Sequence, residues 1–462
     1  MKRRKNNRGA ASPGGPRRST KPEMNRSANY TEVVQLPAPE WSQQVAPNQS
    51  RSRKSMISYV LLGIAISVVL VAAKVAFEHT SFGSMVERRT YSVLSNVLPQ
   101  YRPDGPEVVV VDIGSLPGGT EDSPSGALTP TPRAELRAIL DTLVQLRPRS
   151  IGVDVDFSPT PQGWVDDDDP EFFKHCLKLN EATPITLGVF RTLREPKSAW
   201  LGLPEFARLA GGMWLPPSGL ERTPAWTQAP GVLDKLPSLG AKVAAAGGGE
   251  VMPQIEESGW LHRFRERTEL TNLRPDGLRV GEVLTNHSPV AQLKREAIRI
   301  AKASDLWAYR GAIEGRIVLV GVNANAMDRF PVPTQDMNLP GVIVHASNAY
   351  TLAAEPIWEF SPEARYIIDF ALSGVLLGIA LWLTRGHFSS SRGDTERSER
   401  RALLWLIFVT LGACGLAVYL FRVLWLDFVL VAISLWLHPR VAALLHRYRS
   451  GVRTRGIAAM HS

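Results

Sequence analysis

Cysteine is scarce in this sequence, and the short motifs of common enzyme sites are missing. Only two cysteines occur among 462 residues, Cys176 in a polar region and Cys414 inside an apolar run. Two thiols so placed exclude a disulfide framework, so a folded domain must rely on an ordinary apolar core. The motifs HExxH, GxGxxG, GxxxxGKS/T and GxSxG are absent. The chain has nine histidines, and those within residues 78–365 show no metal-ligand spacing. The sequence therefore predicts no metal site, no cofactor and no enzyme.

The chain has a net charge of +9, and its excess of basic residues lies in three short segments that contain few acids. Residues 1–55 hold 12 Lys/Arg against 3 acids, residues 385–401 hold 5 against 3, and residues 438–462 hold 5 against none. The rest of the chain is net acidic. Basic residues that flank apolar runs fix the orientation of membrane proteins, so nucleic acid is not expected as a partner.

Apolar runs long enough to cross a bilayer occur once near the N-terminus and three times near the C-terminus. The first run is too long for a signal-peptide core, and 55 polar residues precede it. The last run is short, with Arg422 and Asp427 near its start. The predicted transmembrane helices are 56–77, 366–384, 402–421 and 423–437.

The basic segments predict which side of the membrane each part of the chain occupies. Residues 1–55 are expected to be a disordered basic cytoplasmic segment, 385–401 a cytoplasmic loop and 438–462 a basic cytoplasmic tail. Residues 78–365 then form one extracytoplasmic domain. This topology predicts a multi-pass membrane protein, with both termini in the cytoplasm and the lipid bilayer as a partner.

Two carboxylates inside the predicted spans, Asp369 and Asp427, allow more than one interpretation. Intramembrane acids are costly and often functional. Both lie within about one turn of an interface, so they can also reach headgroups or water, as Lys74 can by extending outward. A contact between Asp369 and Arg422 is a third interpretation.

The outer domain alternates short β-branched runs with amphipathic helices, which predicts a mostly parallel α/β sheet with helices on both faces. A helix over 78–106 is expected to lead off the membrane. Residues 191–314 are expected to be an irregular insertion with a helix at about 289–304, although a second domain is an alternative. The remaining predicted strands are 108–113, 150–157, 184–190 and 315–321, and the remaining predicted helices are 134–146, 170–179 and 344–354.

An ordered set of motifs resembles the CHASE2 family of bacterial extracytoplasmic sensor domains. The motifs are VVVVDIGS from Val108, TPRAELRAILDTL from Thr131, IGVDVDFSP from Ile151, GRIVLVGV from Gly315 with MDRFPVP downstream, and LPGVIVHASNAYTL from Leu339. The resemblance covers roughly residues 80–355, and the flanking spans extend it to 440. It implies one preceding and three following transmembrane helices, as predicted here. Family members usually carry a kinase or cyclase output domain, which the short tail 438–462 cannot hold.

Polar residues at the ends of the predicted strands are candidates for ligand binding, because open parallel sheets bind ligands beyond their carboxyl edge. Carboxylates with an Arg and a His suit a small polar ligand or a hard cation such as Mg²⁺ or Ca²⁺. Asp at a strand end also often caps a helix or closes a turn, which is the structural alternative. The candidates are Asp112, Arg133, Asp154, Asp156, Asp328 and His345.

Two further site hypotheses rest on acidic sequence patterns. The run Asp166–Asp169 lacks the Gly and distal Glu of a calcium loop, which favours a solvated loop leading into a helix. Asp154-Val-Asp156 after a strand resembles the nucleophile loop of haloacid-dehalogenase-like phosphatases, in which the first Asp attacks phosphorus. No matching lysine and paired acids follow on later strands, so this hypothesis is disfavoured.

The resemblance therefore implies a sensor of a bacterial cytoplasmic (inner) membrane that passes an extracytoplasmic signal to a separate signalling partner or within a homodimer. Two alternatives are a structural envelope protein that binds a surface component and, less favoured, a metal-dependent surface phosphohydrolase.

Overall fold

The computed structural model describes part of the chain, all of it within the unit Met56–Ser462. The predictions for residues 1–55 and 438–462 lie outside the described residues, as do Arg422 and Asp427. The described residues are 61, 64–65, 68–69, 71–74, 76–77, 80–95, 107–116, 131–158, 164, 166–189, 199–217, 220–228, 234–246, 265–266, 270–274, 277–287, 298–323, 328–333, 338–354, 357–361, 364–371, 374, 392–421 and 423–424.

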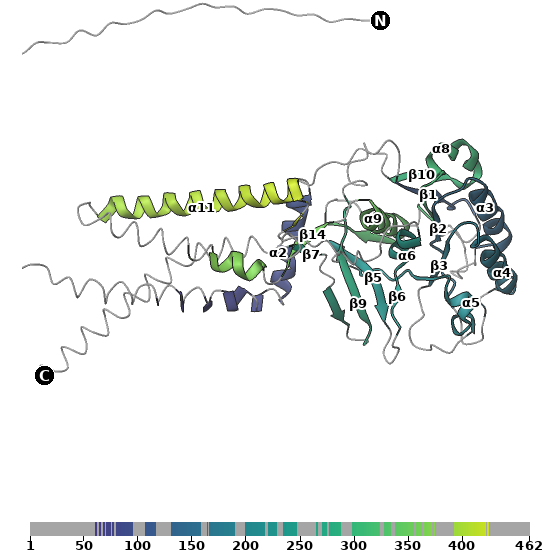
Figure 1. Ribbon diagram of the computed structural model, residues 1–462, viewed down its shortest axis with the longest axis horizontal. Helices are drawn as coiled ribbons and strands as arrows, with labels where there is room; N and C mark the ends of the chain where they lie inside the picture. Colours follow the sequence, from purple (N-terminus) through teal and green to yellow (C-terminus); the bar gives the residue numbers. More distant parts are fainter. Residues whose placement is uncertain are drawn as a thin grey trace, which may run out of the picture. The chain divides into compact units, whose positions relative to one another are not determined.

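Six parallel strands form the main sheet, in the order β10-β1-β11-β2-β3-β4 (Figure 1). Strands β2, β3 and β11 are buried along their whole length, which explains why their sequences are apolar apart from Ser150 and Thr186. The predicted α/β fold with a mostly parallel sheet is confirmed. The strands are β1 (Val108–Asp112), β2 (Ser150–Val153), β3 (Ile185–Val189), β4 (Ala210–Gly212), β10 (Ile298–Lys302) and β11 (Ile317–Gly321).

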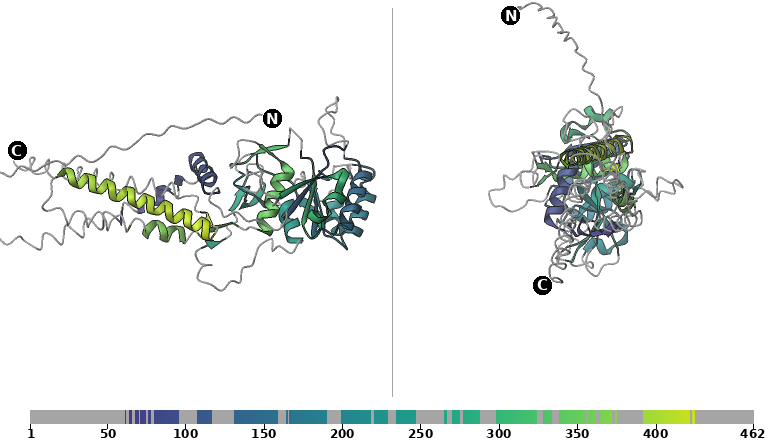
Figure 2. Two further views of the ribbon diagram at one scale, coloured as in Figure 1. Left: turned by 90° about the horizontal axis from the view of Figure 1, so that it is seen from above. Right: turned by 90° about the vertical axis from the view of Figure 1, so that its left-hand side faces the viewer.

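Helices cover both faces of this sheet, as predicted. Successive residues of β1 point to opposite faces, so Val109 packs in one apolar core and Val110 in the other. Helices α3 and α4 lie on the first face and α6 and α9 on the second (Figures 1 and 2). The four helices are α3 (Arg133–Gln145), α4 (Asp169–Leu179), α6 (Leu239–Ala246) and α9 (Gly341–Ala353).

The helix predicted at about 289–304 is wrong where the structure describes it. Residues Ile298–Lys302 form β10, which pairs in parallel with β1 at the edge of the main sheet. A 3₁₀ helix follows at Ala303–Tyr309, and a short helix α8 (Arg310–Ile313) leads into β11. Ile298 and Ala301 fit one helical face, but Ile298 and Ile300 also alternate with strand periodicity. Pairing with the neighbouring strand decided between the two patterns.

The region 191–314 is also more regular than predicted. It supplies β4 and β10 to the main sheet and forms an antiparallel sheet of its own, in the order β6-β5-β9-β8. Trp226 on β5 and Val283 on β9 pack against Ala241 and Ala244 of α6, whereas Leu239 and Val243 of the same helix pack against the main sheet. Helix α6 therefore lies between the two sheets. Its strands are β5 (Arg222–Gln228), β6 (Leu236–Pro237), β8 (Leu270–Leu273) and β9 (Arg279–Leu284).

Helical segments lie where the sequence predicts the first three spans. The described positions between 61 and 77 are helical, as are 364–371 and 374. Helix α11 (Arg392–Phe421) begins within residues 385–401, the predicted cytoplasmic loop, so the second half of that segment is helical. Within the described residues, no helix is both long enough and apolar enough to cross a membrane. The four spans stay predictions.

A three-stranded sheet, in the order β15-β14-β7, joins segments that are distant in the sequence. Strand β14 (Trp358–Phe360) pairs antiparallel with β7 (Arg265–Glu266) and parallel with β15 (Val423–Leu424). Val423 and Leu424 were predicted to start the fourth span, so that helix cannot begin there. Its remaining residues lie outside the described part of the chain.

Candidate functional site

The structure brings together three of the six candidate residues, Asp154, Asp328 and His345. Asp154 follows β2 directly, and His345 lies on the first half of α9. Asp154 Oδ1 and His345 Nε2 are 3.9 Å apart. Asp328 Oδ2 accepts a hydrogen bond of 3.2 Å from the Gly341 amide at the start of α9. We call these three residues the sheet-edge cluster.

Two glycines allow this close approach. A Cβ at Gly321, the last residue of β11, would lie 2.9 Å from the Asp154 Cβ. A Cβ at Gly341 would lie 2.6 Å from Asp328 Oδ2. The cluster therefore depends on the bare backbone of β11 and α9 as well as on its own side chains.

Burial controls protonation in the sheet-edge cluster. It raises the pKa of Asp154 well above the usual range, and the Asp328 carboxylate raises it further. Burial likewise raises the pKa of Asp328, partly offset by the Gly341 hydrogen bond. For His345, burial lowers the pKa to about 4, although the hydrogen bond to Met213 raises it. Two acids with raised pKa values thus lie beside an imidazole whose pKa is lowered.

The hydrogen bonds of His345 define its tautomer. Nε2 lies 3.2 Å from the Met213 carbonyl oxygen, which can only accept, so Nε2 carries the proton. Nδ1 then presents a lone pair and has no hydrogen-bond partner among the described residues, although it is buried. An unsatisfied acceptor costs free energy, so a ligand that donates a hydrogen bond to it would be favoured.

The other candidates have structural roles. Asp112 Oδ1 accepts hydrogen bonds from the amides of Gly114 at 2.9 Å and Asn323 at 3.1 Å. Asp156 is exposed, and its Oδ1 accepts one from the Ser158 amide at 2.9 Å. Both close turns after their strands, as the structural alternative predicted.

Arg133 is turned to a different partner. Its Nε lies 2.6 Å from Asp169 Oδ1, with both side chains buried, and its guanidinium covers the Phe157 ring at 4.5 Å. Asp169 Oδ2 also accepts a hydrogen bond of 3.0 Å from the Asp166 amide. The predicted solvated loop is therefore wrong at Asp169, whose buried side chain neutralises Arg133. Asp169 is the first residue of α4, so the prediction that this acidic run leads into a helix is confirmed.

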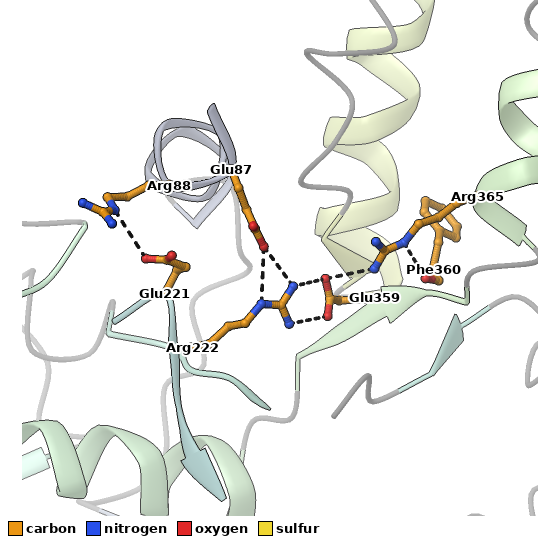
Figure 3. A network of polar contacts seen from close by, with 7 residues as sticks. All are labelled: Glu87, Arg88, Glu221, Arg222, Glu359, Phe360 and Arg365. Carbon is orange, nitrogen blue, oxygen red and sulfur yellow. Dashed lines mark hydrogen bonds and ion pairs between the residues drawn. The ribbon is translucent and has the colours of Figure 1, made fainter. Parts of the chain in front are cut away.

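Sequence reasoning missed a second charged site, centred on Arg222 of β5 (Figure 3). Its Nη1 and Nη2 lie 2.6 and 2.7 Å from the two carboxylate oxygens of Glu359 on β14. Nη2 also lies 3.0 Å from Glu87 Oε1 on α2 (Ser81–Ser95). Arg365 binds Glu359 from the other side at 3.2 Å. We call these four residues the Arg222 network.

The Arg222 network is largely buried and held in its charged form. The side chains of Arg222 and Glu359 are 7% and 2% exposed. Burial alone would raise the pKa of Glu359, but Arg222 and Arg365 outweigh it and hold that pKa below the usual range. The paired fork geometry of Arg222 and Glu359 fixes direction as well as distance. The sequence offers one signal for this site: Glu87 follows the first predicted span, and Glu359 precedes the second. Nothing in the sequence indicates that both bind the same arginine.

An ion pair also joins the first two predicted spans. Lys74 Nζ lies 2.7 Å from Asp369 Oδ2. This contact replaces the interpretation in which each side chain extends separately to the interface. The alternative contact between Asp369 and Arg422 lies outside the described residues.

No metal centre is apparent in the described part of the chain: no three His, Cys, Asp or Glu side chains there are arranged to hold an ion. Cys176 and Cys414 are free and buried, in line with the predicted lack of a disulfide framework.

The fold and its charged contacts define the class of protein. It is an α/β domain with a six-stranded parallel sheet, joined to helical segments on both sides. The model of the CHASE2 domain matches residues 63–385, well over half of the chain, so the chain belongs to the CHASE2 family of extracytoplasmic sensor domains. Neither a curated protein nor a solved structure shows significant similarity to it.

Proposed function

We propose that this protein is a membrane-anchored sensor of a bacterial inner membrane, which passes an extracytoplasmic signal to a separate signalling partner or to a second copy. The domain 78–365 receives the signal and the four spans carry it. The observation that carries the proposal is the Arg222 network. One guanidinium joins Glu87, on the helix after the first predicted span, to Glu359, on the strand before the second.

Exposed apolar side chains support the membrane anchor. Trp405, Phe408 and Val409 of α11 are 71%, 66% and 62% exposed. Large exposed apolar surfaces mark contact with lipid or protein, and these residues lie in the predicted span 402–421.

The sheet-edge cluster is the proposed receiving site. The His345 Nδ1 lone pair accepts a hydrogen bond, whereas the protonated Asp154 carboxyl donates one. A small polar ligand with both donors and acceptors complements this set, and a divalent cation is the second class to test. Asp328 binds the amide of Gly341, the first residue of α9. Ligand binding at the cluster would therefore change the position of α9.

The route inward runs through β14. This strand carries Glu359 of the Arg222 network, pairs with β15 at Val423 and Leu424, and precedes the helical residues 364–371. A shift of β14 would therefore reach the second predicted span and the connection between the third and fourth. Binding would act by favouring one of two arrangements of these segments.

A thermal-shift experiment on the detergent-solubilised full-length protein tests the receiving site. The probes are Mg²⁺, Ca²⁺, glycine, glucose and glycerol, each compared in the wild type, D154N and D156N. A ligand of the cluster raises the melting temperature of the wild type and of D156N, because it binds the folded state, but not that of D154N. A shift that survives in D154N would place binding elsewhere.

A cross-linking experiment tests the signalling role. The tagged full-length protein is cross-linked in membranes and purified. Recovery of a second copy or of a kinase or cyclase lacking its own input domain is expected. Purification of the cross-linked protein alone, as a monomer, would contradict the proposal and favour a structural role in the envelope.

We propose no catalytic activity. Asp154 lies against His345, whereas Asp156 is exposed and closes a turn, an arrangement that does not favour their joint action on a phosphoryl group. Hydrolysis of p-nitrophenyl phosphate with Mg²⁺, lost in D154N, would overturn this view.

A further inference from the structure

Helix α2 divides into two faces of different character. Its inner face carries the buried side chains of Val86, Tyr91 and Leu94. Its outer face exposes Phe82, Met85 and Val93, at 46%, 50% and 62%. The solvent-facing side of an amphipathic helix is normally polar. Three large apolar side chains on the outer face of α2 therefore indicate that this face contacts a partner.

The exposed residues form one stripe along the helix. Phe82, Met85, Arg89 and Val93 recur every three or four residues and therefore lie on the same face. Arg89 is exposed and makes no ion pair with any described residue, and Arg88 beside it is 45% exposed. Apolar side chains interspersed with arginines are typical of helices that lie in a membrane surface, where the cations reach lipid phosphates.

The inner face holds α2 firmly to the domain. The Tyr91 hydroxyl donates to the Thr285 carbonyl oxygen, next to the end of β9. Glu87 binds Arg222 of β5 at 3.0 Å, and Arg88 lies 3.8 Å from Glu221. Whatever contacts the outer face of α2 therefore contacts an element fixed to the second sheet.

The position of α2 along the chain selects the partner. Phe77, the last residue of the first predicted span, is helical, and α2 begins at Ser81. Thr80 caps the new helix: its hydroxyl donates to the Phe77 carbonyl at 2.6 Å and accepts from the Gly83 amide at 3.2 Å. Four residue steps reach at most about 14 Å, comparable to the headgroup layer and its immediate surroundings.

We infer that α2 lies along the outer surface of the bilayer, with Phe82, Met85 and Val93 entering the boundary between headgroups and acyl chains and Arg89 contacting lipid phosphates. This inference rests on the proposed membrane anchor. It makes α2 a platform between the lipid surface and the Arg222 network. The partner is the lipid surface itself, a polar–apolar boundary with anionic groups.

Site-directed spin labelling of the full-length protein in nanodiscs of phosphatidylcholine and phosphatidylglycerol tests this inference. Nitroxides are attached to the variants F82C, M85C and V93C, with the buried Cys176 and Cys414 replaced by Ala. Accessibility to oxygen, which enters lipid, is compared with accessibility to a water-soluble nickel chelate. Ile300, a 44% exposed residue on edge strand β10, supplies the water-facing control, and Trp405 and Phe408 supply the lipid-facing controls.

The expected result is a higher oxygen-to-nickel ratio at all three α2 positions than at the Ile300 position. Nickel access at those positions, with lipid-like values at 405 and 408, would overturn the inference and leave the membrane anchor intact. Low access to both reagents with dipolar broadening would assign the face to a second copy instead. Nickel access at 405 and 408 as well would contradict the anchor itself. A lipid-like ratio at 82 and 85 but not at 93 would show a helix that stands away from the membrane, which also overturns the inference.

Discussion

Lys74 and Asp369 form a buried ion pair, with Nζ and Oδ2 2.7 Å apart and side chains 5% and 4% exposed. They are 295 residues apart in the chain and lie on segments before and after the entire outer domain. Removing two charges from water is costly, so such a pair persists only where its geometry compensates. The pair therefore fixes the first and second predicted spans relative to each other.

Breaking this pair from one side should destabilise the protein. We expect Lys74→Met to lower the free energy of unfolding by about 3–5 kcal/mol, because it removes the buried cation that lies 2.7 Å from the Asp369 carboxylate. The double variant Lys74→Met/Asp369→Leu should recover most of that loss. Unfolding of the purified full-length protein by SDS in mixed micelles measures both. Equal stability of the single and double variants would contradict a paired role.

The Arg222 network should show graded effects that follow burial. Arg222→Met should cost about 3–5 kcal/mol, because among the described residues Glu359 would keep only Arg365 as a cationic partner. Glu87→Gln should cost at most about 1 kcal/mol, because the Glu87 side chain is 30% exposed.

The exposed pair Glu171–Lys174 is the matched control for this comparison. These side chains are 68% and 64% exposed at 3.0 Å, so Lys174→Gln should change stability by about 0–1 kcal/mol. Denaturation of all three variants under one condition provides the ranking. An Arg222→Met loss no larger than that of Lys174→Gln would show that the network does not stabilise the domain.

Asp154→Asn should stabilise the protein at pH 7.5. The folded pKa of Asp154 is raised, so its contribution to stability is complete below the unfolded pKa of about 3.9 and declines as pH rises through the folded value. Asn keeps the shape and cannot ionise. We expect a gain of about 0.5–2 kcal/mol at pH 7.5, as is common when a functional site is neutralised, that disappears toward pH 4.

Melting temperatures of the wild type and D154N between pH 4 and 8 measure this effect. D156N is the control, because Asp156 is exposed and not part of the cluster. A difference between wild type and D154N that does not change with pH would rule out titration of Asp154 as its cause.

Strands buried on both faces could be predicted from sequence, whereas pairing between distant segments could not. The apolar runs of β1 and β11 are characteristic enough to identify alone. In contrast, β4 consists of Ala210, Gly211 and Gly212, residues with little strand preference, and its place depends on pairing with β3. For β10 the same dependence on a neighbour made the helix prediction wrong.

The candidate site shows the same division. The rule that ligands bind at the carboxyl edge of a parallel sheet placed Asp154, Asp328 and His345 together correctly. The same rule could not show that the other three candidates lie outside the cluster. Arg133 binds Asp169, and Asp112 and Asp156 close turns. The Arg222 network joins residues more than 130 positions apart, and no local pattern marks such a contact.

Sided labelling in spheroplasts tests most directly whether the domain is an anchored outer sensor. Single-cysteine variants Lys174→Cys, in the outer domain, and Ser398→Cys, in the predicted cytoplasmic segment 385–401, are treated with a membrane-impermeant maleimide before and after lysis. Lys174 is 64% exposed, so its replacement should react readily. We expect the Lys174→Cys variant to react in intact spheroplasts and the Ser398→Cys variant only after lysis. Reaction of both variants before lysis, or of Ser398→Cys alone, would contradict the proposed topology and with it the sensor.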